Sequence, residues 1–231
     1  MLVEVPEISA VTENEDEAPA SGRRRKTMAA EAPPRLSELL WGIRWSDLLP
    51  IECSEGVEVH SVSYDEAMRF VRAHYNDIFP LVPGSPFNRV DRSPAKERYY
   101  RHAADFFEFR KNGQAIALMI GDPIDWGSYY IRSTAVRREY QGLTLMQRLF
   151  PIVFERLARA GVERVEADAS PSNATSVQIL TRFQFRATGT VLTDRWGALT
   201  RFVKFLSPAA ESTFVSQFCA VRPAPPRRAE R

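Results

Sequence analysis

The pattern of apolar and polar positions becomes regular soon after residue 56. The run "VEVHSVS" (57–63) alternates with a period of two, as a half-buried strand does. Apolar residues then recur at helical spacing in "YDEAMRFVRAHYNDIF" (64–79), and "SPAKERYYRHAADF" (93–106) opens with a serine N-cap followed by proline. The Pro- and Gly-rich run "PLVPGSP" (80–86) between them is typical of a loop. We therefore expect one strand followed by two helices.

Three further strands are predicted next. The runs "FFEFR" (106–110) and "QAIALMIG" (114–121) flank Asn112-Gly113, the strongest short signal for a hairpin, and "YYIRSTAV" (129–136) is the third strand. The remaining pattern predicts a helix over 143–160, the strand "VERVEAD" (162–168), the helix "NATSVQILTRF" (173–183) and a last hairpin over 188–206. The expected order is strand, two helices, three strands, helix, strand, helix, two strands.

The two ends of the chain lack such a pattern. Residues 1–34 mix an acidic stretch with "RRRK" (23–26), and the tail "RPAPPRRAER" (222–231) is similarly polar and Pro-rich. Segments of this kind bury too little apolar surface to offset their chain entropy, so both are predicted to be disordered. We therefore divide the chain into a disordered tail (1–34), an amphipathic helix with a linker (35–55), a main domain (56–207) and a C-terminal extension with a disordered tail (208–231).

The segment before the main domain, "RLSELLWGIRWSDLLP" (35–50), is typical of a short amphipathic helix. We expect its apolar face to pack on the chain's own domain, and docking of a partner is the alternative. The residues of that face are Leu36, Leu39, Leu40, Ile43 and Leu48.

Composition narrows the class of protein. With 231 residues, of which 44% are hydrophobic, the chain is long enough to bury one substantial core. The formal charge of +2 does not favour nucleic-acid binding, and no apolar run reaches the ~18 residues of a membrane span. Cys53 and Cys219 form no metal-ligand or redox spacing, which favours a reducing cytoplasm. Arginine greatly outnumbers lysine, as is typical of a GC-rich bacterial genome, and the lysines are Lys26, Lys96, Lys111 and Lys204.

Two motifs in a fixed order carry a family resemblance. The first, "AVRREYQGLTLMQRLF" (135–150), combines a valine, a short loop, Gln-Gly and an apolar helix. The second, "NATSVQILTRFQF" (173–185), places an asparagine, a serine and apolar residues at fixed offsets. In both motifs the chain resembles the GCN5-related N-acyltransferases (GNAT), from about Val57 to Leu206. The resemblance implies an α/β (α+β) fold, with a mixed, mostly antiparallel twisted sheet flanked by helices.

The resemblance also implies acyl-CoA as the cosubstrate, and no metal. In this family the pantetheine arm of CoA pairs with the strand that ends here at Val136, much as a peptide adds to a sheet edge. The pyrophosphate is held by backbone N–H groups at the start of the next helix, where the helix dipole favours an anion. The cofactor-binding residues implied are Val136, Arg138, Gln141, Gly142, Leu143, Thr144 and Asn173.

The start of this helix departs from the family pattern. Thr144 and Met146 stand where small residues would be expected. Backbone donors do not need particular side chains, but glycine lets a phosphate approach closely, and the branched Cβ of Thr144 takes up room. We interpret the turn as a modified anion cradle. Weaker CoA binding stays an open alternative, as does a donor on an acyl carrier protein, which has no adenosine diphosphate to hold.

The second motif departs from the family at its catalytic positions. Leu180 stands where the family often has the tyrosine that protonates the departing thiolate, and Gln184 replaces the usual glycine. A CoA thiol should have a pKa of about 8.5, so the missing acid slows the reaction without abolishing it. Tyr140, Ser170 or a water are the candidates to replace that acid. A loop aromatic and a turn hydroxyl are the simpler interpretations of the two side chains.

Asp168 is the candidate base that takes a proton from the acceptor amine. It lies near the end of a strand, five residues before Asn173, where some family members carry a carboxylate in that role. An ion pair with a nearby arginine is the alternative interpretation. Glu166 lies on the same face of the strand by alternation.

Three hypotheses for the function follow from these residues. The first is transfer from acyl-CoA to an amine of a small molecule or a peptide. The second is transfer of a longer chain with acyl carrier protein as the donor, and the third, motivated by Leu180, is a catalytically inactive binding module with a GNAT fold. A homodimer is left open. The side chains that could line an acceptor pocket, with core packing as the alternative, are His74, Tyr75, Phe79, Phe87, Tyr99, Tyr100 and His102.

Overall fold

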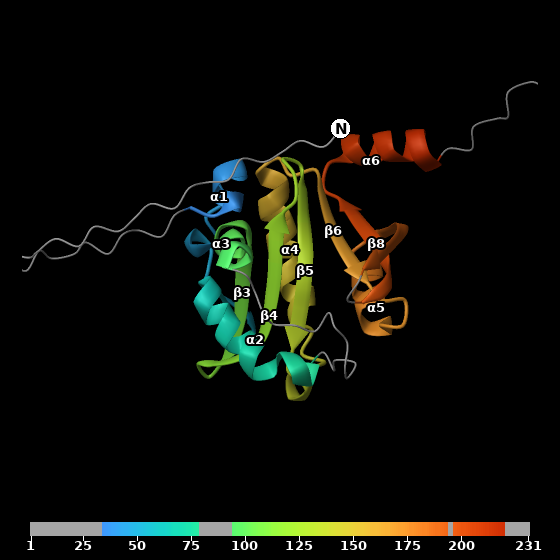
Figure 1. The fold of residues 1–231 in the computed structure, drawn as a ribbon. Helices are drawn as coiled ribbons and strands as arrows, with labels where there is room; N and C mark the ends of the chain where they lie inside the picture. The colour runs from blue at the N-terminus through green and yellow to red at the C-terminus, as the bar shows by residue number, and fades with distance from the viewer. Residues whose placement is uncertain (1–33, 79–93, 194–195, 220–231) are drawn as a thin grey trace, which may run out of the picture. The chain divides into compact units, whose positions relative to one another are not determined.

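The computed structural model describes residues 34–78, 94–193 and 196–219, arranged as in Figure 1. An eight-stranded sheet has the strand order β1-β2-β3-β4-β5-β6-β8-β7. The strands are β1 (Ile51–Ser54), β2 (Val57–Ser61), β3 (Asp105–Lys111), β4 (Gln114–Pro123), β5 (Ser128–Val136), β6 (Arg164–Ala169), β7 (Arg186–Thr193) and β8 (Gly197–Phe205). The α-helices are α1 (Leu36–Trp41), α2 (Tyr64–Ile78), α3 (Pro94–Ala103), α4 (Leu145–Arg159), α5 (Ala174–Arg182) and α6 (Pro208–Phe214).

Neighbouring strands of this sheet run antiparallel, except β5 and β6, which are parallel. The predicted fold class, a mixed and mostly antiparallel sheet flanked by helices, is confirmed. The predicted order of elements between residues 57 and 206 also agrees with the structure. The β3–β4 hairpin turns at Asn112 and Gly113, whose φ angles of 49° and 75° are both left-handed, as a two-residue type I′ turn requires.

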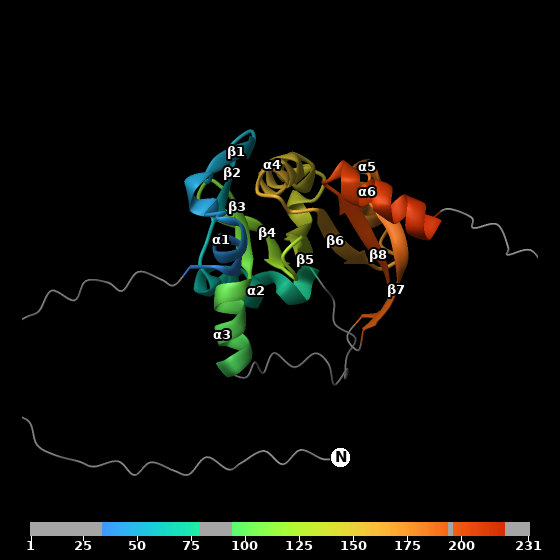
Figure 2. The ribbon, with the colours of Figure 1, turned by 90° about the horizontal axis from the view of Figure 1, so that it is seen from above.

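Helices cover both faces of the sheet. Figure 2 shows α4 and α5 on one side, and α2 and α3 on the other. On the second side, Ala67 and Phe70 of α2 are buried in one cluster with Phe106 and Leu118 of the sheet. The stripe that α4 buries against the sheet consists of Leu145, Met146, Leu149, Phe150, Val153, Phe154 and Leu157.

The segment before the sheet packs on its own domain, but only part of the predicted apolar face is buried. Leu39 and Leu40 are 66% and 44% exposed, so that part of the prediction is wrong. The helix α1 is six residues long and ends at Gly42, whose φ of 63° is left-handed, and it is therefore too short to present a continuous stripe. Burial comes from Ile43, which belongs to the predicted face, and from Trp45, which packs edge-on against Phe107 with ring centroids 5.0 Å apart.

The two edge strands of the sheet are short or irregular. β1 has four residues, and its register against β2 shifts between Glu52 and Ser54. β7 is mostly exposed, and its register against β8 shifts between Ala187 and Gly189. The pattern did not predict β1, because four residues are too few to show an alternation.

The C-terminal extension begins with α6. Ser207 caps this helix, its hydroxyl accepting a hydrogen bond from the Ala210 amide at 3.4 Å, and Pro208 occupies the first helical position. A π-helical turn, η4 (Val215–Cys219), follows. The segments predicted to be disordered, 1–34 and 222–231, lie outside the described residues except for residue 34, and so does the predicted loop 80–86. Within the described ranges, we find no helix that combines the length and the apolar character needed to cross a membrane.

Candidate active site

The two parallel strands β5 and β6 separate within the sheet. They are paired from Ser128–Arg164 to Ile131–Ala167, and beyond that point β5 continues to Val136 while β6 ends at Ala169. Figure 1 shows the two strands diverging. Within the described part of the chain, the edge of β5 that faces β6 therefore has no strand partner after Ile131.

The backbone of Val136 faces this gap. The Arg137 amide donates to the Ile116 carbonyl on β4 at 3.0 Å, and successive residues of a strand point their backbone groups to opposite edges. The N–H and C=O groups of Val136 consequently point away from β4. The side chain of Gln141 confirms this direction, since its Nε2 donates to the Val136 carbonyl at 3.3 Å.

The chain turns from β5 into α4 through the residues predicted to form the anion cradle. Arg138 and Tyr140 bound the short 3-10 helix η3 (Arg138–Tyr140), Gly142 has a φ of 92°, and Thr144 is the N-cap of α4 with a φ of 54°. The left-handed conformation costs a branched residue such as threonine roughly 1–2 kcal/mol, so a small residue would be favoured there. Leu143, between them, is partly buried against the core.

The N-terminus of α4 carries no side-chain cap. Thr144 makes no capping hydrogen bond, so the first backbone N–H groups of the helix are available to an anion from outside the helix. Met146 is only 5% exposed and belongs to the core cluster. Its side chain is therefore directed into the core, and its bulk does not narrow the approach to these N–H groups.

Asp168 forms an ion pair, as one of its two interpretations predicted. Its Oδ1 accepts from Arg201 Nε at 2.9 Å, and its Oδ2 accepts from Arg201 Nη2 at 3.0 Å and from the Tyr130 hydroxyl at 3.0 Å. Its side chain is 5% exposed. Glu166 lies on the same face, as expected, with its Oε2 3.2 Å from Arg201 Nη1. The role of Asp168 as a base stays a prediction.

Tyr130 and Arg201 were not identified from the sequence. Burial, and secondly the Asp168 carboxylate, raise the pKa of the Tyr130 hydroxyl, so this group stays a proton donor toward Asp168. Only a weak feature of the sequence indicated Tyr130 as a site residue: it stands between Tyr129 and Ile131, which are buried, and so points to the other face of β5. The partnership of Asp168 with Arg201 depends on the β6–β8 register, which places the two residues opposite each other.

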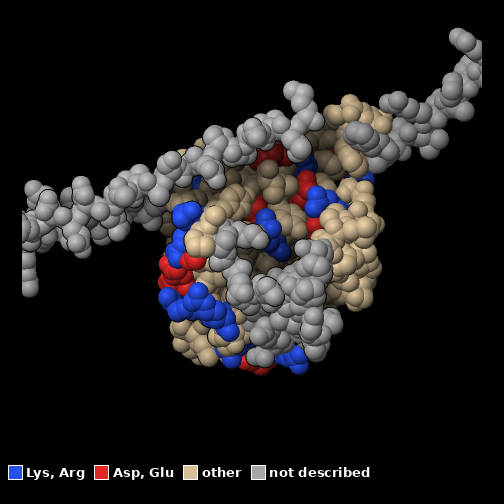
Figure 3. All heavy atoms as spheres, in the orientation of Figure 1, with Lys and Arg blue, Asp and Glu red and all other residues tan. Residues whose placement is uncertain are grey.

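A second ion pair, between Arg132 and Asp122, lies between the first ion pair and α3. Arg132 Nε and Nη2 donate to the two oxygens of Asp122 at 2.7 and 2.8 Å, and Asp122 is 1% exposed. The Arg132 guanidinium also lies 5.5 Å from the ring centroid of Tyr100 and 5.3 Å from that of Tyr130. Figure 3 shows acidic and basic side chains inside a hollow on this side of the molecule. We call the set Tyr100, Asp122, Tyr130, Arg132, Glu166, Asp168 and Arg201 the polar face.

The other residues predicted for catalysis make local contacts. Tyr140 is partly buried, with the Arg137 guanidinium 5.3 Å from its ring centroid. The Ser170 hydroxyl lies 2.8 Å from that of Ser172. Leu180, which replaces the tyrosine that the family often has, is 6% exposed within the core cluster that includes α4.

Two positions of the second motif have backbone roles. The Oδ1 atom of Asn173 accepts from the Ser176 amide at 3.1 Å and so caps α5. Gln184 has a φ of 63°, a conformation that favours glycine, which is the residue usual at this point of the motif.

The predicted acceptor wall is only partly described. The ring of Tyr100 lies against the Arg132 guanidinium, whereas Tyr99 is 55% exposed and His102 is exposed. His74 lies against Phe70, with ring centroids 5.1 Å apart. The side chain of Tyr75 and the residues Phe79 and Phe87 lie outside the described part of the chain. In that described part, no three His, Cys, Asp or Glu side chains are grouped so as to hold a metal ion.

Comparison with known proteins identifies a family. The Acetyltransferase (GNAT) family matches residues 68–185, just over half of the chain. Among curated proteins, no sequence matches this chain.

Solved structures with a similar fold include three bacterial proteins. The ribosomal-protein-S5-alanine acetyltransferase from Vibrio fischeri has a TM-score of 0.53 at 16% identity, covering 69% of this chain and 98% of that chain. YncA from Salmonella typhimurium, solved with its cofactor acetyl-CoA, has a TM-score of 0.52 at 16% identity, covering 66% and 95%. The spermidine/spermine N-acetyltransferase SpeG from Vibrio cholerae has a TM-score of 0.52 at 14% identity, covering 69% and 99%. At such identities the likeness establishes the fold.

Proposed function

Because the chain belongs to the GNAT family of acetyltransferases, we propose that it transfers an acyl group from acyl-CoA to an amine of a small molecule or a peptide. The observation that carries this proposal is the separation of β5 and β6. It leaves the backbone of Val136 facing a gap, and the turn 137–144 leads from Val136 to the uncapped N-terminus of α4. A pantetheine arm needs backbone partners, and a pyrophosphate needs N–H donors.

In this proposal Val136 supplies backbone groups to the pantetheine amides. The hydrogen bond from Gln141 Nε2 to the Val136 carbonyl, at 3.3 Å, is long, so pantetheine can displace it at small cost. The α4 N-terminus and Gly142 receive the pyrophosphate. Nothing lies within 4 Å of the position that a Cβ atom of Gly142 would take, so the approach to this backbone is open. Two exposed residues are assigned to donor binding as well. Arg138 lies in the turn before α4, and Asn173 lies at the start of α5.

The acceptor is proposed to bind on the polar face. Its amine nitrogen attacks the thioester carbonyl, a C–N bond forms, the C–S bond breaks, and the CoA sulfur leaves as a thiolate. A carboxylate has about four lone-pair positions, and Asp168 uses three of them toward Arg201 and Tyr130. The fourth position is assigned to the acceptor ammonium, whose proton Asp168 removes. Leu180 has no proton to give, so the thiolate leaves through its own low basicity, with Tyr140 or Ser170 as stand-in donors.

Leu180 also favours a second candidate, a module that binds a pantetheine compound without turnover. A third candidate, an acyltransferase that takes its donor from acyl carrier protein, is motivated by Thr144, because its strained backbone and branched side chain sit at the phosphate cradle. Met146 faces the core and therefore does not narrow the phosphate cradle.

One set of measurements separates the three candidates. Calorimetry with acetyl-CoA and with an acetylated acyl carrier protein identifies the donor. Mass spectrometry of the acceptors then detects turnover. The acceptors to include are a peptide with an N-terminal alanine and spermidine, because two structural neighbours are a ribosomal-protein-S5-alanine acetyltransferase and a spermidine/spermine N-acetyltransferase. Binding of acetyl-CoA without any acylated amine would overturn the proposal and leave the binding module.

A further inference from the structure

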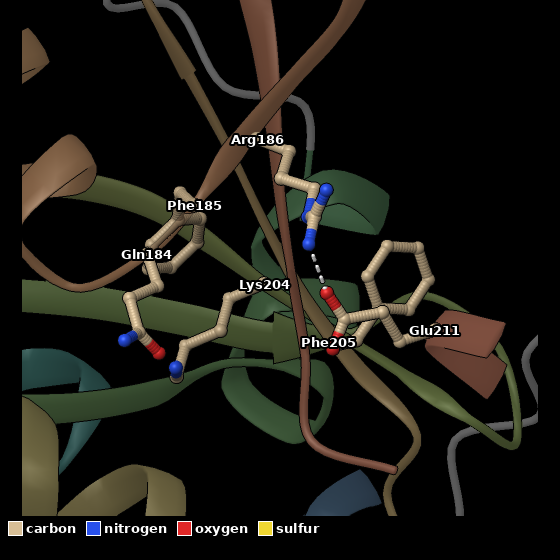
Figure 4. A pocket seen from close by; sticks show the side chains of 6 residues that line it. All are labelled: Gln184, Phe185, Arg186, Lys204, Phe205 and Glu211. Carbon is tan, nitrogen blue, oxygen red and sulfur yellow. Dashed lines mark hydrogen bonds and ion pairs between the residues drawn. The ribbon is translucent and has the colours of Figure 1, made fainter. Parts of the chain in front are cut away.

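A cavity lies away from the β5–β6 gap, at the end of the sheet where β8 leads into α6. It has a volume of about 410 Å³, within the range of roughly 300–1,000 Å³ that small-molecule sites occupy. Figure 4 shows its six lining side chains: Gln184, Phe185, Arg186, Lys204, Phe205 and Glu211.

The cavity exists because β7 starts late. Its first residue, Arg186, is paired with Val203, so among the described strands none pairs with Lys204 and Phe205 of β8 on that side. The helix α6 then closes one wall, since Arg186 Nη2 lies 2.5 Å from Glu211 Oε1. The cavity is thus held between two strands and a helix by an ion pair.

Lys204 brings an uncompensated charge into this cavity. Its Nζ lies 5.7 Å from the ring centroid of Phe154, and among the described residues no carboxylate lies within ion-pair distance of it. Burial lowers the pKa of this ammonium, and the more distant Glu211 opposes that shift. Arg186 and Glu211 neutralise each other, so the lining carries one net positive charge.

Gln184 adds a polar group to the lining of the cavity, and its backbone has a conformation that is unfavourable for glutamine. Its φ of 63° costs a residue with a Cβ atom about 1 kcal/mol, and glycine would avoid that cost. Its side chain nevertheless lines the cavity beside the aromatic ring of Phe185 (Figure 4). The side-chain amide of Gln184 can donate a hydrogen bond to an anion, and a role in binding is a reason for a strained residue to stand here.

We propose that this cavity is a binding site for a small organic carboxylate, separate from the site of acyl transfer. The carboxylate pairs with the Lys204 ammonium and accepts a hydrogen bond from the Gln184 amide. The apolar part of the ligand packs against Phe205, which is only partly buried, whereas Phe185 is 5% exposed and packs in the core. An anion is favoured over a cation because the net charge of the lining is positive, and an organic acid over a bare ion because an aromatic ring forms part of the wall.

Because the chain has few lysines, ligand binding at Lys204 can be followed through the NMR signal of its own side chain. Protein made with ¹³C-labelled lysine has four labelled side chains, and the Lys204→Arg variant assigns the signal of Lys204 by its loss. Benzoate is the probe, because it joins one carboxylate to one ring. We expect benzoate to shift the Lys204 Cε signal in a saturable way and to leave the signal of Lys111 unmoved.

Matched probes and variants test each part of the site. Benzamide has the ring without the charge and acetate has the charge without the ring, so each should bind at least about tenfold more weakly than benzoate. Lys204→Met should weaken benzoate binding by about tenfold or more, measured by calorimetry, whereas Lys111→Met should not change it. Gln184→Gly should raise the melting temperature of the free protein and yet weaken benzoate binding, a combination that a purely structural glutamine would not give.

The outcomes decide the proposal. A Lys204 signal that does not respond to benzoate overturns it, as does an equal response of Lys111, which would mean non-specific binding. Equal binding of benzamide would remove the role of charge and also overturn it. Because the titration is made on the wild-type protein, a Lys204→Met variant that fails to fold would not prevent the decision.

Discussion

Asp168 and Arg201 lie opposite each other on β6 and β8, and the guanidinium of Arg201 donates to both carboxylate oxygens, at 2.9 and 3.0 Å. The carboxylate is almost fully buried, whereas Arg201 is 36% exposed in its side chain. A pair of this kind fixes the direction of the carboxylate and also supports the fold. Any test of Asp168 as a base therefore has to separate the two effects.

We expect Asp168→Asn to lower turnover most at low pH, where the acceptor amine depends on a base, and to leave donor affinity nearly unchanged. The variant should also lose ~1–3 kcal/mol of unfolding free energy, because a partly buried charge pair is broken. Arg201→Gln is the matched control, since it breaks the same pair but keeps the carboxylate. Steady-state kinetics against pH and urea unfolding of both variants provide the measurements. Equal loss of turnover in the two variants would mean that Asp168 acts only through the fold.

Gly142 and Gly161 offer a matched test of the donor site. Both have left-handed φ angles, 92° and 85°, and both have open space at the position of a Cβ atom. Valine at either position should cost a similar ~1–2 kcal/mol in unfolding free energy. Only Gly142→Val should weaken acetyl-CoA binding, by about tenfold or more in calorimetry, because Gly161 lies beyond the opposite end of α4. Unchanged affinity in a folded Gly142→Val protein would place the donor elsewhere.

Leu180→Tyr restores the residue that the family often has at this position. Leu180 is 6% exposed in the core, so the larger side chain should cost about 1–3 kcal/mol of stability. In a folded variant we expect turnover with acetyl-CoA above pH 7 to rise or stay level, since a proton donor for the thiolate is added. A fall in turnover, with the melting curve intact, would show that the tyrosine hydroxyl does not reach the thiol.

Asp105 should make the stability of the protein depend on pH. Burial raises its pKa to about 6 from the ordinary 3.8, against the opposing effects of Arg35 and of hydrogen bonds from Ser37 and Tyr129. Between these two pH values the folded protein retains a proton that the unfolded chain has lost. This contribution is therefore largest below pH 4 and is lost as pH rises to 6, by up to ~3 kcal/mol.

The test of this pH dependence compares wild type with Asp105→Asn. Urea unfolding at pH 4 and at pH 7 gives the change in unfolding free energy for each protein. On going from pH 4 to pH 7, wild type should lose stability relative to the variant, because asparagine does not titrate. A parallel pH dependence in the two proteins would contradict the raised pKa.

The parts of the fold predicted correctly are those in which local pattern and tertiary structure agree. The long stripe of α4 and the Asn112-Gly113 turn are examples. Thr144 was identified as misplaced at a position for a small residue, and its left-handed φ gives the physical reason.

The parts that were missed depend on contacts between distant segments. The burial of Ser37, whose hydroxyl donates to Asp105 at 2.8 Å, cannot be read from a helix pattern that favoured Leu39 and Leu40. The pairing of Asp168 with Arg201 likewise depends on the register of β6 and β8, and register is set by the whole sheet. A candidate carboxylate could be named from the sequence, but its partners could not.

The irregular edge strands have a consequence for self-association. A long, flat edge strand offers a row of backbone groups to which another chain can add, and bulges and short strands remove that template. Here β1 has four residues and a register shift, and β7 has its own shift next to Gly189. Neither edge is suited to continuous pairing with a second sheet. A homodimer, if it forms, is therefore expected to use a helical or loop surface, and the sheet edges protect the protein against growth into filaments.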